Sequence, residues 1–234
     1  MKLSFVGIEA MTCYDIFYRK LLSEEHMPRQ DNTKDLFLLE ALKLFAEKGY
    51  DRVTLQEIAK RVGCVPSALY KHYKNKQELY DDILEKSAEG NKMYLARMEQ
   101  LRKHDVDNLD LVVGMSVEER VTAMQELFLE TVHDEWVSNF RKLMMIEQFH
   151  MPELGMMYDA RYIDSKVEFF TAWIRLLMDK GLVEKEDPQA LAVMLSYPFS
   201  LAIGVVDRDP SKEQWALNML ADNVRLFSRT YIKY

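Results

Sequence analysis

Cysteine, glycine and proline are scarce in this chain of 234 residues, which contains 2 Cys, 8 Gly and 6 Pro. Cys13 and Cys64 are far apart in sequence. They therefore form neither a metal-ligand spacing nor a disulfide framework, which suits a reducing cytoplasm. The few glycines and prolines leave little material for the turns of a β-sandwich. Met, Leu, Glu and Lys are plentiful instead and favour helices.

Catalytic signatures and long apolar runs are also missing from the sequence. No apolar run approaches the ~20 residues that span a bilayer, so we predict a cytoplasmic protein without a membrane partner. The sequence has no HExxH motif and no Gly-rich phosphate loop, and its 5 His are scattered. His104–Asp105 and His133–Asp134 are adjacent pairs whose members point in different directions on a helix. We therefore expect no enzymatic activity, no metal and no cofactor.

Residues 1–30 form an N-terminal extension that superficially resembles a signal peptide. Glu9 and Asp15 interrupt its apolar stretch, and no small-residue cleavage site follows. Two alternatives remain open for this extension. It forms an extra amphipathic helix around residues 8–22, or the natural start is Met27 and the upstream part is marginal.

The hydrophobic pattern beyond residue 31 predicts an all-α protein. Apolar residues recur at helical spacing between Asn32 or Thr33, which can cap a helix, and Gly49, which can end it. Further helices are predicted over 54–63, 66–72, 76–103, 117–131, 134–149, 156–180, 188–206 and 211–231. A loop after residue 103 would separate a small domain, residues 31–80 with a linking helix to about 103, from a larger domain, residues 104–234.

One segment is free of acidic residues although the chain has a net charge of −7. Between Ile58 and Gln77 the charged residues are Lys60, Arg61, Lys71, Lys74 and Lys76. Across residues 33–86, ten bases face nine acids, so the positive bias is local. Two short helices joined through a glycine turn make a helix-turn-helix, whose second helix can enter the DNA major groove between phosphate walls. A solvated helical hairpin carrying five bases by chance is the alternative.

The same segment resembles the N-terminal signature of the TetR family of bacterial regulators. The matching residues, in order and spacing, are Thr54, Ile58, Ala59, Gly63, Tyr70, His72, Tyr73, Lys76 and Leu79. The specific match covers roughly residues 33–80. The resemblance implies an N-terminal three-helix helix-turn-helix domain that binds DNA, followed by a larger helical domain that binds a ligand and dimerises.

The resemblance also implies DNA contacts by seven residues. Thr54, at the start of its helix, would touch a phosphate, as helix N-termini do. Tyr70 and His72 would hydrogen-bond to backbone phosphates, and Lys76 would neutralise another. The other three, which lie where the recognition helix meets base edges or the groove wall, are Pro66, Ser67 and Lys71. Ordinary surface is the alternative for these three. Tyr73, where the family usually has Phe, is assigned to the core.

The recognition segment departs from the family pattern at several positions. Val65 replaces the common Ser cap, which removes an acceptor typically worth ~1 kcal/mol. Val62 replaces Ala, and Cys64 occupies the usual Val position as a small hydrophobe. No Arg, Asn or Gln lies between residues 65 and 73, and those side chains make the strongest base contacts. Contacts to phosphates or to DNA shape are therefore expected to carry more of the affinity.

The larger domain is rich in aromatic residues and methionine, which suit the wall of a ligand cavity. The candidate ligand-binding residues are Trp136, Phe140, Met144, Tyr162, Phe169, Phe170 and Trp173, three of which (162, 169 and 173) fall on one face of a predicted helix. A well-packed core is the alternative. The resemblance implies a homodimer through the last two helices, about 188–206 and 211–231. Packing of these helices within a monomer is the alternative.

We therefore predict a ligand-responsive, sequence-specific DNA-binding transcriptional regulator. We expect a homodimeric repressor that a small apolar or amphipathic effector releases from double-stranded operator DNA. The alternative is a helical ligand- or protein-binding module that has lost operator recognition. The weak start of the recognition helix at Val65 motivates this second hypothesis.

Overall fold

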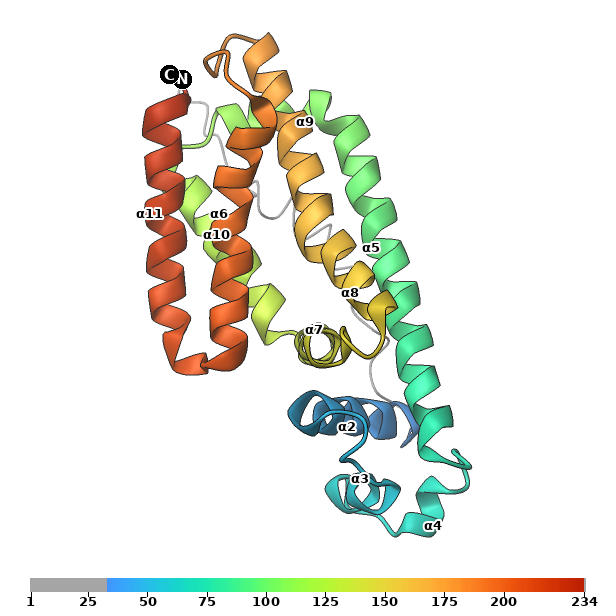
Figure 1. Ribbon diagram of the computed structural model, residues 1–234. Helices are drawn as coiled ribbons and strands as arrows, with labels where there is room; N and C mark the ends of the chain where they lie inside the picture. The colour runs from blue at the N-terminus through green and yellow to red at the C-terminus, as the bar shows by residue number, and fades with distance from the viewer. Residues whose placement is uncertain (1–32, 234) are drawn as a thin grey trace, which may run out of the picture.

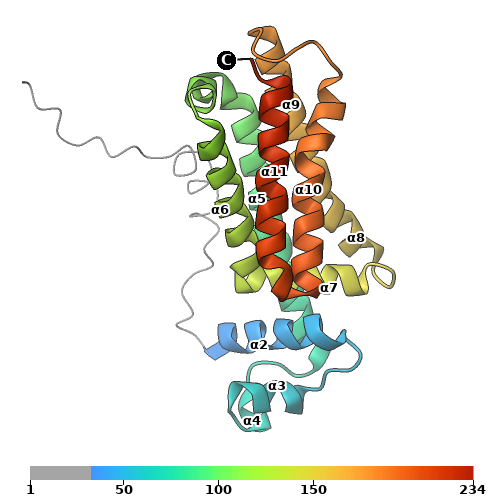
Figure 2. The same ribbon diagram turned by 90° about the vertical axis from the view of Figure 1, so that its left-hand side faces the viewer.

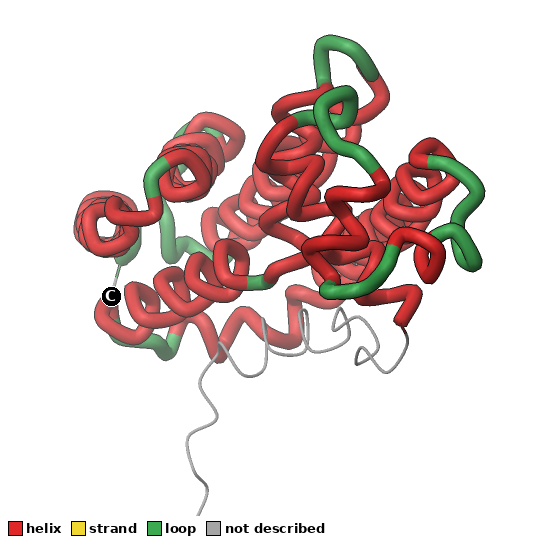
Figure 3. The backbone as a smooth tube through the Cα atoms, turned by 90° about the horizontal axis from the view of Figure 1, so that it is seen from below, coloured by secondary structure: helices red, strands yellow, loops and turns green. Residues whose placement is uncertain are grey.

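A computed structural model describes residues 33–233, with the side chains of residues 97 and 100–113 left out. The expectations for residues 1–30 lie outside the described residues. Every regular element of the described chain is a helix, apart from one isolated bridge between Val183 and Ile232 (Figure 3). The predicted all-α fold is confirmed, with a small helical domain at one end and a larger helical bundle at the other (Figure 1).

The small domain contains α2 (Thr33–Lys48), α3 (Leu55–Val62) and α4 (Pro66–Leu69). Its helix ends follow the predicted signals. The Thr54 hydroxyl accepts a hydrogen bond from the Glu57 backbone N–H at 3.3 Å. Gly49 and Gly63 end α2 and α3 with φ of 79° and 80°, values that favour glycine. The Leu69 and Tyr73 side chains are buried in the core of this domain, as expected for Tyr73.

The recognition helix is shorter than expected. A helix over 66–72 was predicted, but α4 ends at Leu69, and residues 70–72 form a turn in which the His72 N–H donates to the Leu69 carbonyl at 2.9 Å. Val65 provides no side-chain cap at the start of α4. A single helical turn without a cap depends on tertiary packing, here of Leu69. The Asn75 side chain then accepts from the Glu78 N–H at 2.8 Å and starts the next helix.

The linking helix α5 (Lys76–Val113) runs ten residues beyond the predicted end near 103 and passes through Gly90 without a break. The expected loop after residue 103 was therefore wrong, and the proposed boundary at residue 104 falls inside α5. Val106, Leu109 and Val113 recur at helical spacing. The polar residues between them favoured a loop, whereas the helical spacing of the apolar residues correctly indicates that the helix continues. A short connection, residues 114–116, leads to the next helix.

The larger domain contains α6 (Val117–His133), α7 (Glu135–Glu147), α8 (Pro152–Asp159), a π-helical segment η2 (Ala160–Asp164), α9 (Ser165–Asp179), α10 (Pro188–Arg208), a 3-10 turn η3 (Pro210–Lys212) and α11 (Glu213–Tyr231). Ser116 and Glu119 form the predicted capping box at the start of α6. The Asp134 carboxylate accepts from the Val137 N–H at 2.8 Å at the start of α7. Figure 2 shows α10 and α11 side by side along one face of the bundle.

The segment predicted to interrupt the pattern near residue 152 instead starts a helix. Pro152 stands at the first helical position, where its missing N–H has no cost, so α8 begins four residues before the predicted start at 156. The chain then continues through η2 into α9. Because a π-helix bonds i to i+5, η2 rotates the residues before it relative to those after it.

The two domains share one hydrophobic cluster. Buried residues of α2, α3, α4 and α5 pack together with Phe140, Leu143 and Met144 of α7 and with Leu154 of α8. In Figure 2, α7 lies directly above α2, which explains why α2 is buried on most of its circumference. The helix-turn-helix domain therefore packs against the larger domain through α7.

A buried ion pair joins α7 to α10. The Arg141 side chain is fully buried, and its Nε and Nη2 atoms donate to Asp207 at 2.6 and 2.8 Å. A third bond runs from Nη1 to the Thr131 carbonyl at 3.1 Å. Burial alone would lower the pKa of Arg141, but the hydrogen bonds with Asp207 outweigh it, and the pKa lies above its ordinary value.

Helix α10 corrects the statement that no apolar run approaches the length of a membrane span. By length and composition, Pro188–Arg208 is long and apolar enough to cross a bilayer. In the fold this helix packs against α6, α9 and α11. A core helix of a helical bundle has the same composition, so its hydropathy is weak support for a membrane protein.

Candidate nucleic-acid interface and ligand pocket

Six of the seven predicted DNA-contacting residues are exposed to solvent. They are Thr54, Pro66, Ser67, Tyr70, Lys71 and His72. They come from the start of α3, from α4 and from the turn after it, and α4 lies at the tip of the molecule farthest from α9–α11 (Figure 1). Val65, beside them, is 65% exposed. We call residues 54, 65–67 and 70–72 the α4 surface.

The positive charge near the α4 surface is smaller than the sequence suggests. Arg61 is turned toward α2, where its Nη atoms contact Glu47 at 2.7 and 2.8 Å and its Nε contacts Glu40 at 3.1 Å. The hydrogen bonds with Arg61 lower the pKa of Glu47 below its usual value. The lysines that are exposed and have no ion pair among the described residues of this segment are Lys60, Lys71 and Lys74.

Lys76 differs from the other predicted DNA contacts because its ammonium group binds the protein itself. It is partly buried, and its Nζ donates to the Tyr50 carbonyl at 2.8 Å and lies 4.1 Å from the Tyr50 ring centroid. Lys76 thus ties the start of α5 to the loop after α2. A phosphate must compete with these contacts, and the phosphate role of Lys76 stays a prediction.

Tyr50 forms a junction between the two domains that sequence reasoning missed. Its backbone N–H donates to the Glu147 carboxylate, at the end of α7, at 2.9 Å. Its ring lies 4.5 Å from that of Tyr80 on α5. A Cβ at Gly49 would lie 3.3 Å from Glu147 Oε1, so glycine suits both the close approach and the positive φ. The contact joins residues 97 positions apart, which no local pattern reveals.

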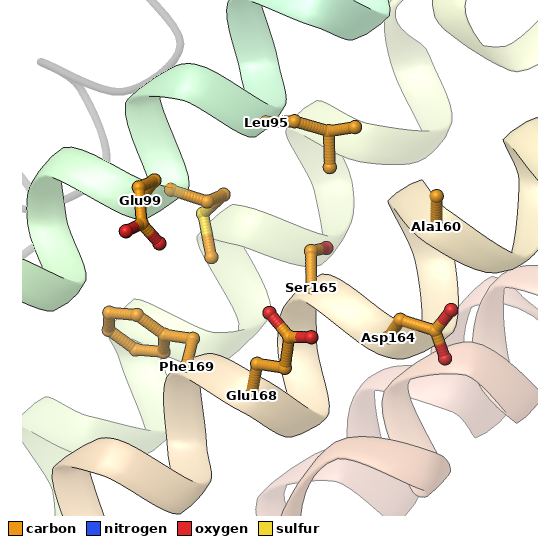
Figure 4. Close-up of a pocket in the computed structure, with 8 residues that line it drawn as sticks. Leu95, Glu99, Ala160, Asp164, Ser165, Glu168 and Phe169 are labelled. Carbon is orange, nitrogen blue, oxygen red and sulfur yellow. The ribbon is translucent and has the colours of Figure 1, made fainter.

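A pocket of about 320 Å³ lies between α5, η2 and α9 (Figure 4). Its lining residues are Leu95, Met98, Glu99, Ala160, Asp164, Ser165, Glu168 and Phe169. Apolar side chains from α5 and α9 thus share the pocket with carboxylates. Phe169 is the single member of the seven predicted ligand-binding residues that lines this pocket.

The other six candidates lie in packed contacts. Phe140, Met144 and Tyr162 are buried in the cluster shared with the helix-turn-helix domain. Trp136 packs against the same cluster. Phe170 and Trp173 belong to a second cluster with α10 and α11, their ring centroids 6.4 Å apart. The ligand role of all seven residues stays a prediction.

Residues 162, 169 and 173 are all buried, but they contact different parts of the fold, and their common face stays a prediction. Tyr162 lies in the cluster shared with the helix-turn-helix domain, Phe169 lines the pocket and Trp173 faces α10. Tyr162 lies in the π-helical segment η2, which has more residues per turn than an α-helix. The position of Tyr162 around the helix axis, relative to the residues of α9, therefore differs from that in a regular α-helix. The simple helical period used for the prediction does not allow for such a segment.

The last two helices expose large apolar side chains on the outside of the bundle. Met194, Tyr197 and Leu201 of α10 are 47–53% exposed and follow an i, i+3, i+7 spacing on one face. Trp215 and Leu226 of α11 are exposed to a similar degree. Because other residues of both helices are buried in the bundle, packing within one monomer leaves this face unused. We call these five residues the α10–α11 face.

Two family models match the chain. One, for bacterial regulatory proteins of the tetR family, matches residues 37–83, and one, for the C-terminal domain of AefR-like transcriptional repressors, matches residues 119–233. The curated relatives include the negative transcriptional regulator IcaR of the biofilm operon icaADBC. The Staphylococcus epidermidis protein is 42% identical over 33% of this chain and 39% of its own length. The Staphylococcus aureus (strain Newman) protein is 26% identical over 62% and 80%.

Solved structures resemble the fold of most of the chain. The SmeT–triclosan complex, whose protein is the repressor of a Stenotrophomonas maltophilia multidrug efflux pump, aligns with a TM-score of 0.52 and 22% identity. The alignment covers 86% of this chain and 92% of that one. At this identity the likeness concerns the fold alone.

Proposed function

Because the chain belongs to the TetR family of bacterial transcriptional regulators, we propose that it is a cytoplasmic repressor whose homodimer binds operator DNA through two α4 surfaces. The observation that carries this proposal is the α4 surface itself. At the tip of the molecule, the start of α3, the short helix α4 and the turn after it expose hydroxyl, imidazole and lysine groups. Side chains of these types bind phosphates, which position a protein on DNA.

The exposed apolar group of Val65 suggests one direct contact with bases. In the major groove, thymine is distinguished by its methyl group, which apolar side chains can contact. Val65 and Pro66 lie together at the start of α4 and are both exposed. With no strong bidentate donor on α4, we expect phosphate contacts and DNA shape to supply most of the affinity.

Salt dependence of DNA binding tests this function. Binding of the full chain to the DNA flanking its own gene is measured by gel shift at several salt concentrations. Each phosphate neutralised adds roughly 0.9 to the slope of log K against log salt. Lys71→Ala should lower the affinity and reduce the slope by about 1, whereas Lys185→Ala, an exposed lysine in the loop before α10, should change neither. A slope that Lys71→Ala leaves unchanged contradicts the proposal.

The dimer part of the proposal rests on the α10–α11 face. Five half-exposed apolar side chains on two adjacent helices can be buried by a second copy across a two-fold axis. A symmetric dimer also presents two α4 surfaces to two half-sites, one helical turn of DNA or a multiple of it apart.

A small apolar or amphipathic effector in the larger domain would control DNA binding. The supporting observation is that the helix-turn-helix domain packs against α7. The contact consists of the shared hydrophobic cluster and the hydrogen bond from the Tyr50 N–H to the Glu147 carboxylate. A movement of α7 would be transmitted to α2, which packs against α7, and through α2 to α3. To act as an inducer, the effector must bind the state with low DNA affinity more tightly, because equal affinity shifts nothing.

A second candidate function is a helical ligand- or protein-binding module without operator recognition. The uncapped, single-turn α4 and the neutralised Arg61 favour it. Gel shifts separate the two hypotheses. Absent binding, or binding independent of salt, favours the module, whereas a steep slope that depends on Lys71 favours the repressor.

A further inference from the structure

The pocket between α5, η2 and α9 combines apolar walls with negative charge (Figure 4). Its volume of about 320 Å³ falls within the range of roughly 300–1,000 Å³ that is usual for pockets holding small organic molecules. The charged residues of its described lining are all acids, namely Glu99, Asp164 and Glu168. The apolar side chains come from both helices and are Leu95, Met98 and Phe169.

Glu168 brings a negative charge to this pocket that nothing in the described chain matches. Its side chain is exposed, and no described residue gives it a hydrogen bond or an ion pair. The same holds for Asp164. In Figure 4 the carboxylates of Glu168, on α9, and Glu99, on α5, point into the space between the two helices. Carboxylates that share a site repel one another, and a cation placed between them relieves this repulsion.

The basic residues next to these acids in the sequence contact aromatic rings. The Arg161 guanidinium lies 4.3 Å from the ring centroid of Tyr94, and the Lys166 Nζ lies 5.1 Å from that of Phe199 on α10. Neither Arg161 nor Lys166 lines the pocket. A cation that enters from outside therefore meets acids and apolar groups in the described lining, and no basic side chain.

A buried acceptor near the pocket also has no donor. The Oδ1 atom of Asn91 accepts no hydrogen bond from the described residues, although the residue is only 9% exposed. Asn91 precedes Leu95 by four residues on α5, so the two side chains lie on the same face of the helix, one turn apart. A buried acceptor without a donor is costly. A ligand with N–H groups at this end of the pocket could supply one.

We propose that this pocket binds an organic ammonium ion that has an apolar body. The ammonium group lies at Glu168, on the exposed side of the pocket, and the apolar body lies against Leu95, Met98 and Phe169. Because Phe169 is only 5% exposed, it forms the inner wall. Carboxylates and aromatic rings are the protein groups that attract ammonium ions.

The position of the pocket on α5 gives such a ligand a route to the helix-turn-helix domain. Helix α5 begins at Lys76, and its residues Leu79, Tyr80 and Ile83 belong to the cluster shared by the two domains. The same helix contributes Leu95 to the pocket. A ligand that changes the separation of α5 and α9 would therefore move a helix on which the helix-turn-helix domain packs. Only this effector role rests on the proposed function, whereas binding of the cation does not.

The test uses dansylcadaverine, which carries one ammonium group, and its N-acetyl derivative, which is neutral. Both are titrated by fluorescence against the full chain, which should bind the cation more tightly. Glu168→Gln keeps the size of the side chain and removes its charge. We expect this variant to bind the cation roughly three- to tenfold more weakly and the neutral compound unchanged. Glu153→Gln, at an exposed residue of α8 outside the pocket, changes the net charge equally and should bind both compounds as the original chain does.

A second variant tests whether the compounds occupy the pocket itself. Ala160→Phe places a ring in the pocket and should weaken the binding of both compounds. Thermal unfolding checks that each variant is folded, and Ala160→Leu, a smaller change, replaces Ala160→Phe if that protein does not fold.

Four results overturn the proposal. They are the absence of cation binding to the original chain, equal affinities of the original chain for the two compounds, unchanged cation affinity in Glu168→Gln, and unchanged cation affinity in the folded Ala160 variant. DNA binding with and without dansylcadaverine is measured separately. If the cation binds through Glu168 and DNA affinity does not change, the site stands and the effector role fails.

Discussion

The buried ion pair between Arg141 and Asp207 is worth testing because it joins α7, the seat of the helix-turn-helix domain, to α10 of the proposed dimer face. Both side chains are almost completely buried, and two hydrogen bonds of 2.6 and 2.8 Å connect them. Asp207→Ala removes both bonds and leaves the guanidinium inside the bundle with the Thr131 carbonyl as a hydrogen-bond acceptor. An uncompensated buried charge is the expected result.

Breaking a buried pair by removing one partner costs about 3–5 kcal/mol. Against a total stability of about 5–15 kcal/mol, this is a large fraction. For a chain of this size each kcal/mol corresponds to a midpoint shift of roughly 2–4 °C, so we expect Asp207→Ala to unfold roughly 6–20 °C lower. Circular dichroism during heating measures the shift. Protein concentration must be held constant, because the stability of a dimer depends on it.

The chain provides a matched control in the pair between Arg225 and Glu118. It joins α11 to α6 through two similar hydrogen bonds of 2.9 and 2.8 Å, but both side chains are exposed. We expect little change from Glu118→Ala, because solvent screens an exposed pair. The double variant Arg141→Met with Asp207→Leu should recover most of the stability that Asp207→Ala loses. Equal midpoints for Asp207→Ala and Glu118→Ala would refute the reasoning.

Three further changes test other parts of the account. Leu201→Glu should make the protein monomeric in analytical sedimentation. Phe149→Glu, at an exposed apolar residue outside α10 and α11, should leave the dimer intact. A Leu201→Glu protein that is still a dimer would contradict the proposal that the α10–α11 face is the dimer interface. Val65→Ser adds the missing cap of α4 and should raise the free energy of unfolding by about 1 kcal/mol in denaturant titrations; a decrease would contradict this. Lys166→Met should have a higher free energy of unfolding than the original chain at pH 7, and this difference should become smaller toward pH 10. The reason is that the lysine loses its proton near pH 7 in the folded chain and near pH 10.5 in the unfolded chain. A difference in the free energy of unfolding that does not vary with pH would exclude a lowered pKa of Lys166.

The helix boundaries that depend on a few neighbouring residues could be predicted from the sequence. Thr54, Ser116 and Asp134 cap their helices as expected, because a side-chain oxygen reaches a backbone N–H three residues away. Gly49 and Gly63 end theirs at positive φ. The predictions failed where a local signal competed with a longer period. The polar residues after 103 suggested a loop, but α5 continues to Val113.

The candidate sites were predicted less completely, because their contacts join distant residues. Arg61 was counted as free charge, although Glu40 and Glu47 neutralise it from another helix. The hydrogen bond between Tyr50 and Glu147 and the position of the Lys166 ammonium group beside the Phe199 ring both require the tertiary fold. Periodicity identifies which residues turn inward, but it does not distinguish a packed side chain from one that lines a pocket.

Selection of binding sites from random DNA duplexes by the full chain tests the central claim most directly. If two α4 surfaces of a symmetric dimer meet DNA, repeated rounds should enrich an inverted repeat whose half-sites lie one helical turn or a multiple of it apart. Failure to enrich any sequence over the starting pool would contradict operator binding. Enrichment of an asymmetric, single site would contradict the dimeric arrangement.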